Sequence, residues 1–107
     1  MDKSKAIKVI QKFAKILKKE GIAVDHVILY GSYAKGNMRP HSDIDVAVVS
    51  KNFGRDQVEE GMLLFRIAGK IDPRLEPVPI SKKNYEDDTW IPLIHEIREK
   101  GVKVKIA

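Results

Sequence analysis

Two aspartates separated by one residue, Asp43 and Asp45, are the side chains of this sequence best suited to chemistry. They lead into an apolar run, residues 46–49, that is typical of a strand. Because side chains alternate faces along a strand, both carboxylates should project from one face as near neighbours. Adjacent carboxylates repel each other, and a divalent cation between them removes the conflict. Carboxylate oxygens are the ligands that Mg²⁺ prefers, so the pair predicts a magnesium site rather than a turn and a helix cap.

A small-residue turn, Gly31-Ser32, precedes the two aspartates and follows another apolar run, residues 27–30. Glycine lets the backbone come close to a ligand, and the N–H groups and serine hydroxyl of such a turn can hold phosphate oxygens. Lys35 and Arg39 lie in the same loop, where they either neutralise phosphate charge or are simply solvated. A phosphate-binding turn beside a carboxylate metal site predicts metal-dependent phosphoryl or nucleotidyl transfer.

A third carboxylate often polarises or deprotonates the attacking hydroxyl in this kind of chemistry. Glu76 opens the next extended segment and is the first choice for that role. Asp72 competes with it, although its place before Pro73 suits the end of a helix.

The pattern of Gly31-Ser32, ten further residues and Asp43-x-Asp45 resembles the signature of the polymerase-β-like nucleotidyltransferases. The short chain and its GSYAKG and SDID runs are similar to the minimal nucleotidyltransferases (MNT) of that superfamily. The resemblance implies transfer of AMP from ATP to a hydroxyl, with two Mg²⁺ ions held by Asp43, Asp45 and Glu76. It also implies that Gly31 and Ser32 hold the triphosphate. The family commonly has aspartate at the third carboxylate, whereas this chain has glutamate.

Larger relatives carry an additional acceptor-binding domain that this sequence does not include, so the acceptor is expected on a partner chain. The resemblance implies a helical HEPN ribonuclease toxin, which family members neutralise by adenylylating one of its tyrosines. Two alternatives stay open: an antitoxin that blocks its partner sterically, and a small-molecule nucleotidyltransferase subunit of the aminoglycoside-modifying kind. A nucleic-acid reader is a distant further alternative.

Length and composition indicate one domain, 1–107, and 43% hydrophobic residues suffice for a compact fold. With no cysteine and no long apolar run, we expect a cytoplasmic protein without disulfides or a membrane span. The net charge of +5 resides in residues 1–20, which hold seven lysines and two acids. No aromatic platform accompanies those lysines, so a solvated face is favoured over nucleic-acid binding. Whether the chain forms a homo-oligomer is left open.

The expected fold is α/β (α+β), a mixed sheet of about four strands with three main helices, mostly on one face. The link from Gly31 to Ser42 is short for a parallel crossover, so the first two strands should be antiparallel neighbours. The two prolines of segment 76–80 place it at a sheet edge. Trp90 is expected to be a core or staple residue, whereas an exposed Trp there would suggest a protein interface. In helix 55–71 a wide apolar stripe is expected to pack, with close contacts at Gly61 and Gly69. The expected elements are helices 4–20, 55–71 and 89–100, a helical turn 32–35, strands 24–30, 43–49, 76–80 and 102–106, and a polar loop 81–88.

Overall fold

The protein folds around a four-stranded mixed sheet with strand order β3-β2-β1-β4. The computed structural model describes residues 2–39, 41–87 and 90–106. β1 pairs antiparallel with both β2 and β4, whereas β2 pairs parallel with β3. The antiparallel pairing of the first two strands and the edge position of the proline-containing strand are therefore confirmed. The strands are β1 (His26–Tyr30), β2 (Ile44–Ser50), β3 (Leu75–Ser81) and β4 (Val102–Lys103).

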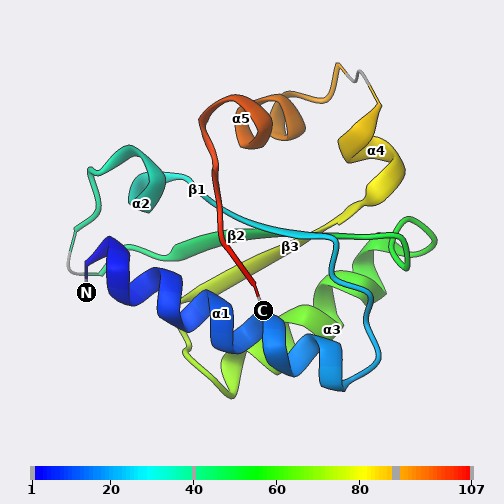
Figure 1. The fold of residues 1–107 in the computed structure, drawn as a ribbon, viewed down its shortest axis with the longest axis horizontal. Helices are drawn as coiled ribbons and strands as arrows, with labels where there is room; N and C mark the ends of the chain where they lie inside the picture. The colour runs from blue at the N-terminus through cyan, green and yellow to red at the C-terminus, as the bar shows by residue number, and fades with distance from the viewer. Residues whose placement is uncertain (1, 40, 88–89, 107) are drawn as a thin grey trace.

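Helices cover both faces of this sheet, not mostly one face as expected. α1 (Lys3–Lys19) and α3 (Gln57–Gly69) lie side by side under one face, and α5 (Pro92–Lys100) and the short α4 (Lys82–Glu86) lie over the other (Figure 1). The one-turn helix α2 (Ser32–Lys35) follows directly on β1. The parallel β2–α3–β3 connection uses a helix because two parallel strands need a long crossover.

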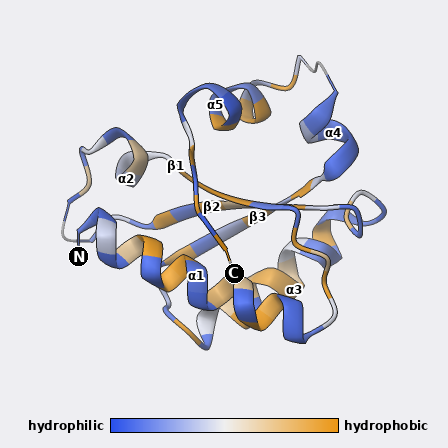
Figure 2. Ribbon diagram, in the orientation of Figure 1, coloured by the Kyte–Doolittle hydropathy of each residue, from blue (hydrophilic) through white to orange (hydrophobic). Residues whose placement is uncertain are grey.

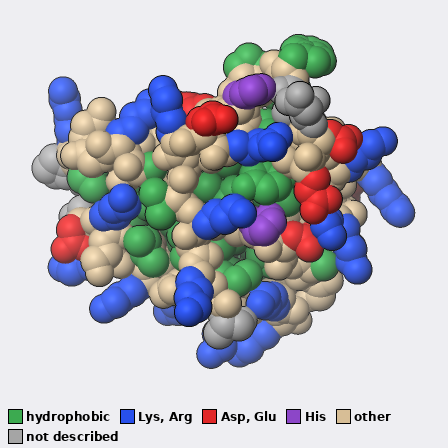
Figure 3. All heavy atoms as spheres, turned by 45° about the horizontal axis from the view of Figure 1, so that its top comes forward, with side chains coloured by type: hydrophobic (Ala, Val, Ile, Leu, Met, Phe, Trp, Pro, Cys, Tyr) green, Lys and Arg blue, Asp and Glu red, His purple; other side chains and the backbone are tan. Residues whose placement is uncertain are grey.

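Each face of the sheet has its own hydrophobic core. Alternate residues of β1 and β2, such as Leu29 and Val48, pack with α1 and α3, while Ile28 and Val49 pack under α5. The strands are therefore the most continuously apolar part of the chain, and the outer faces of the helices carry the charge (Figure 2). The face that carries α4 and α5 also brings hydrophobic side chains to the surface between its charged ones (Figure 3).

α1 has the amphipathic pattern that the sequence indicates. Asp2 caps its N-terminus by accepting a 2.8 Å hydrogen bond from the Lys5 amide, and its lysines point outward. The buried residues are Ala6, Ile10, Phe13, Ala14 and Leu17.

The C-terminal third differs most from expectation. Residues 82–86, expected in a polar loop, form α4 because the Ser81 hydroxyl accepts a 3.1 Å hydrogen bond from the Asn84 amide. α5 begins at Pro92 rather than near Thr89, which lies outside the described residues. β4 ends at Lys103 instead of residue 106, although the Val104 amide still donates to the Val27 carbonyl.

Trp90 is the clearest error of the sequence reading. It was expected to be a core or staple residue, but 87% of its surface is exposed. A Trp just before a helix can serve as a packing residue, and here the start of α5 packs through Ile94 instead.

None of the helices in the described parts of the chain is long and apolar enough to cross a membrane.

Candidate active site

Three side chains on adjacent strands form a row across one end of the sheet. Asp45 of β2 is paired with Tyr30 of β1 on one side and with Glu76 of β3 on the other. Directly paired residues share a face, so all three project on the α5 side together with Asp43, two residues before Asp45. The structure thus brings together the three predicted carboxylates, Asp43 just before β2, Asp45 in β2 and Glu76 in β3, and their catalytic roles stay predictions.

Gly31 lies against Asp45. It adopts a φ of +71° at the N-cap of α2, and a Cβ added there would collide with Asp45 Oδ2. Only glycine meets both demands, a left-handed backbone and no side chain. The Gly-Ser turn therefore lies against Asp45. We call Asp43, Asp45 and Glu76 together the carboxylate row.

The carboxylate row is electrostatically unfavourable by itself. Partial burial, then the Asp43 and Glu96 charges, raise the pKa of Asp45. Partial burial, then the charges of Asp43 and Asp45, raise the pKa of Glu76. Desolvation, reinforced by the carboxylates, raises the pKa of Tyr30 to about 12, so its hydroxyl keeps its proton.

The donor set fits a hard divalent cation. It consists of carboxylates whose mutual repulsion a cation would relieve, and carboxylate oxygens are ligands that Mg²⁺ takes. Within the described ranges no three acidic or histidine side chains are drawn together as a ready-made metal cage. Asp43 and Glu76 are exposed, so both carboxylates are open to a ligand from solvent.

Ser32 begins α2, where the first backbone N–H groups of a helix lack intrahelical partners. No side chain in the described chain caps this end. The Ser32 carbonyl is occupied by hydrogen bonds from the amides of Gly36 and Asn37. The uncapped N-terminal end of α2 therefore starts at Gly31, which lies against Asp45.

The two loop cations are placed differently. Lys35 forms a 3.1 Å ion pair with Glu96 of α5, so it bridges α2 to the helix over the site. Arg39 is exposed in a tight turn in which its amide donates to the Ser42 hydroxyl at 2.7 Å and its carbonyl accepts from the Ser42 amide. The structure brings Lys35 close to the site's acidic groups and leaves Arg39 at the rim.

Asp72 has a structural role, because it accepts hydrogen bonds from Arg74. Arg74 binds both of its carboxylate oxygens, at 3.1 and 2.8 Å, and also donates its backbone amide to Oδ1 at 2.9 Å. These hydrogen bonds lower the pKa of Asp72. Asp72 is therefore engaged by Arg74, whereas Glu76 pairs with Asp45, and the role of Glu76 as the third carboxylate stays a prediction.

Two residues of the site were missed. Tyr30 could have been found from the sequence, because it precedes Gly31 at the end of the first apolar run. Glu96 could not, since only the packing of α5 on the sheet brings it within reach of Lys35 and Asp45.

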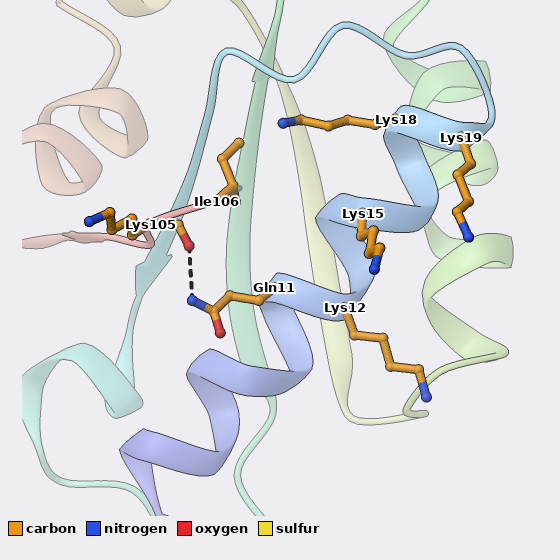
Figure 4. Close-up of a pocket in the computed structure, with 7 residues that line it drawn as sticks. All are labelled: Gln11, Lys12, Lys15, Lys18, Lys19, Lys105 and Ile106. Atoms are coloured by element: carbon orange, nitrogen blue, oxygen red, sulfur yellow. Dashed lines mark hydrogen bonds between the residues drawn. The ribbon is translucent and has the colours of Figure 1, made fainter.

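A separate groove of about 790 Å³ lies between the outer side of α1 and the C-terminal segment (Figure 4). Lysine side chains surround it, and the Gln11 side chain donates to the Lys105 carbonyl at its edge. It contains neither acids nor aromatics, which agrees with a solvated lysine face. The lining residues are Gln11, Lys12, Lys15, Lys18, Lys19, Lys105 and Ile106.

Comparison with known proteins decides the family. The model of the nucleotidyltransferase domain family matches residues 10–106, which include the Gly-Ser turn and all three carboxylates. The chain belongs to the nucleotidyltransferase domain family. It is a nucleotidyltransferase, and the resemblance seen in the sequence is confirmed.

One relative supports this assignment, and three solved structures share the fold. The chain is 31% identical over 102 residues to the "Putative protein adenylyltransferase MJ0141" of Methanocaldococcus jannaschii, covering 92% of this chain and 97% of the relative. A "putative nucleotidyltransferase from Sulfolobus solfataricus" shares the fold with a TM-score of 0.67 at 16% identity, over 94% of this chain and 80% of that one.

The two other solved structures come from toxin–antitoxin complexes. One, determined with AMP-PNP, has a TM-score of 0.62 at 20% identity over 91% of this chain and 73% of that one. The other, a mutant of the toxin–antitoxin MntA-HpeT, has a TM-score of 0.60 at 18% identity. The match covers 100% of this chain and 75% of that one. At these identities the likeness establishes the mixed α/β nucleotidyltransferase fold.

Proposed function

We propose that this nucleotidyltransferase transfers AMP from ATP to a hydroxyl of a partner protein. The leading acceptor is a tyrosine of a helical HEPN-type ribonuclease toxin, which makes the chain an antitoxin. The single observation that carries the proposal is the row of Asp45 and Glu76 packed against Gly31, because it joins a carboxylate site to a phosphate-binding turn.

The choice of protein as acceptor rests on the relative named as a protein adenylyltransferase and on the toxin–antitoxin neighbours. The surface adds support, because Trp90 stands exposed just before α5, the helix over the carboxylate side of the sheet (Figure 1). Tryptophan is enriched in protein interfaces and is often a major contributor to binding.

The chemistry follows from the placement of the groups. The acceptor oxygen forms a bond to the α-phosphorus of ATP while the bond to pyrophosphate breaks. Glu76, whose pKa is raised, orients the acceptor or takes up its proton. Gly31 and Ser32 hold the triphosphate with the amides of the first turn of α2. Asp43, Asp45 and Glu76 would hold two Mg²⁺ ions, which supply positive charge against the triphosphate.

Lys35 completes the triphosphate site in this proposal. Its ion pair with Glu96 joins side chains that are 44% and 37% exposed, and such a pair is worth only up to about 1 kcal/mol. ATP can therefore draw Lys35 away from Glu96 at little cost. Arg39 contributes charge from the rim.

The deciding experiment incubates the purified chain with labelled ATP, Mg²⁺ and the product of its neighbouring gene, the proposed HEPN-type partner. We expect label on the partner from the wild type and none from Asp43→Asn/Asp45→Asn. Glu99→Gln, which removes an exposed carboxylate of α5 away from the row, serves as the matched control and should label normally.

The alternatives predict other results. If neither the wild type nor the double variant labels the partner, and the double variant still binds and neutralises it, steric inhibition is supported. Label on an aminoglycoside with the chain alone would support the small-molecule reading. Either result would overturn protein adenylylation.

A further inference from the structure

α3 presents an apolar stripe to solvent. Val58, Met62 and Phe65 follow one another at spacings of four and three residues and are 74%, 67% and 62% exposed. The opposite side of the helix, Leu64 with Ile67 and Ala68, is already buried against the sheet. The sequence reading expected the whole stripe to pack within the chain, which is wrong for these three residues. A helix that is apolar on both sides is characteristic of one covered on both sides.

The two glycines of α3 lie beside this stripe and have no internal explanation. A Cβ on Gly69 would meet nothing within 4 Å, and one on Gly61 would only touch Pro79 Cδ at 3.9 Å. The expected close packing at these glycines is therefore absent within the chain. Each costs helix stability of about 0.5–1 kcal/mol relative to alanine. What they provide is a bare backbone surface on the outside.

Charges flank the stripe in a self-complementary order. Glu59 and Arg66 are seven residues apart on one side of it, both exposed, and neither forms an ion pair in the described chain. If a second α3 packs antiparallel, Glu59 of each copy faces Arg66 of the other, so the contact forms twice. In a symmetric parallel pair Glu59 of one copy lies level with Glu59 of the other, so the opposite charges do not meet.

We propose that α3 is the contact surface of a homodimer in which two copies pack antiparallel about a two-fold axis near Leu63. In this register Met62 meets its own symmetry mate, Val58 lies over Gly69 of the partner subunit, and Phe65 lies over Gly61 of the partner subunit. Large side chains thus oppose glycines, which lets the two helices approach closely.

The dimer leaves the catalytic side open. α3 packs under the face of the sheet opposite to α5, whereas Asp43, Asp45 and Glu76 project on the α5 side (Figure 1). Two active sites therefore face away from the contact, and each remains free for ATP and a protein acceptor. The inference does not depend on the identity of that acceptor.

A charge swap tests the pairing. Sedimentation equilibrium should find the wild-type chain as a concentration-dependent dimer. Glu59→Arg and Arg66→Glu should each weaken dimerisation at least about tenfold, since like charges then face each other twice. The double variant Glu59→Arg/Arg66→Glu should restore the wild-type constant. A monomeric wild type up to millimolar concentration, or a double variant as weak as the single ones, would overturn the proposal.

The absence of cysteine allows a second, geometric test. With the two-fold axis near Leu63, position 62 is displaced from its own mate by only about 3 Å along the helix axis, whereas position 58 is displaced by about 15 Å. Met62→Cys should therefore form a disulfide dimer on mild oxidation, whereas Val58→Cys should not, because a disulfide needs Cβ atoms within about 4.5 Å. Val58→Cys/Gly69→Cys should cross-link again. Cross-linking of Val58→Cys alone, or none with Met62→Cys, would rule out this register.

Discussion

Glycines mark two regions of this protein for opposite reasons. Gly31 stands where nothing larger fits, because Asp45 occupies the space of its Cβ and its backbone is left-handed. Gly61 and Gly69 stand where a side chain would fit within the chain, on a helix that alanine would stabilise. The first glycine is explained by the molecule's own geometry. No close contact in the described chain explains Gly61 and Gly69, whereas the proposed contact with a second copy of α3 would explain both.

The largest effect is expected from Gly31→Ala. The collision with Asp45 and the positive φ should together destabilise the fold by about 1–3 kcal/mol. Displacement of the carboxylate should also reduce nucleotidyl transfer by at least about 100-fold. Thermal unfolding and transfer rates measure both effects. Gly36→Ala is the matched control, since Gly36 has a φ of +79° but nothing within 4 Å. Equal losses in the two variants would show that the contact with Asp45 is unimportant.

Asp45→Asn should reduce transfer by about 100- to 1,000-fold, because a charge aimed at the reacting centre is lost. Stability without divalent cations should not fall and should rise slightly, since the repulsion from Asp43 and Glu96 is relieved. Initial rates and unfolding in chelator test the two parts. An active Asp45→Asn enzyme would remove the carboxylate row from the mechanism.

Gly61→Ala should have the opposite sign to Gly31→Ala. In dilute solution it should raise the free energy of unfolding by about 0.5–1 kcal/mol, because the helix gains propensity and the new methyl group meets only Pro79. Dimerisation should weaken, because the new methyl group occupies the space in which Phe65 of the second copy packs over Gly61. Chemical denaturation at low concentration and sedimentation separate these outcomes. A destabilised monomer would mean that the glycine serves internal packing after all.

The smallest effect is expected from a substitution of Asp72. This carboxylate lies outside both the carboxylate row and the exposed surface of α3. Its pKa is lowered in the folded state by Arg74, so its contribution to stability is complete above the unfolded value near 3.8 and is lost as pH falls below it. Asp72→Asn should therefore be less stable than wild type at pH 7, with the difference shrinking towards pH 3. Transfer activity should be unchanged, in contrast to Glu76→Gln. A stability difference that does not depend on pH would exclude the charged pair as its cause.

Much of the site was readable from local pattern. Asp43 and Asp45 share a face because strand residues alternate, and the Gly31-Ser32 turn falls between two apolar runs. Glu76, preferred over Asp72 because Pro73 signals a helix end, does lie beside Asp45, and its catalytic role stays a prediction. The binding roles assigned to Ser32, Lys35 and Arg39 stay predictions.

The errors about burial share one cause, because the sequence of an apolar stretch does not show which surface covers it. Trp90, Val58, Met62 and Phe65 were all assigned to the interior, and all are exposed. Hydrophobicity predicts burial, but the partner that buries a residue need not be the same chain.

The sequence by itself determined most of the elements, the antiparallel pairing of the first two strands and the clustering of Asp43 with Asp45, because strand alternation and turn residues act over a few positions. Only the tertiary structure decided that Tyr30, Asp45 and Glu76 form one row, that Glu96 holds Lys35, and that α3 keeps one apolar side free. These depend on strand order and helix placement, which are set by the packing of residues far apart in the chain.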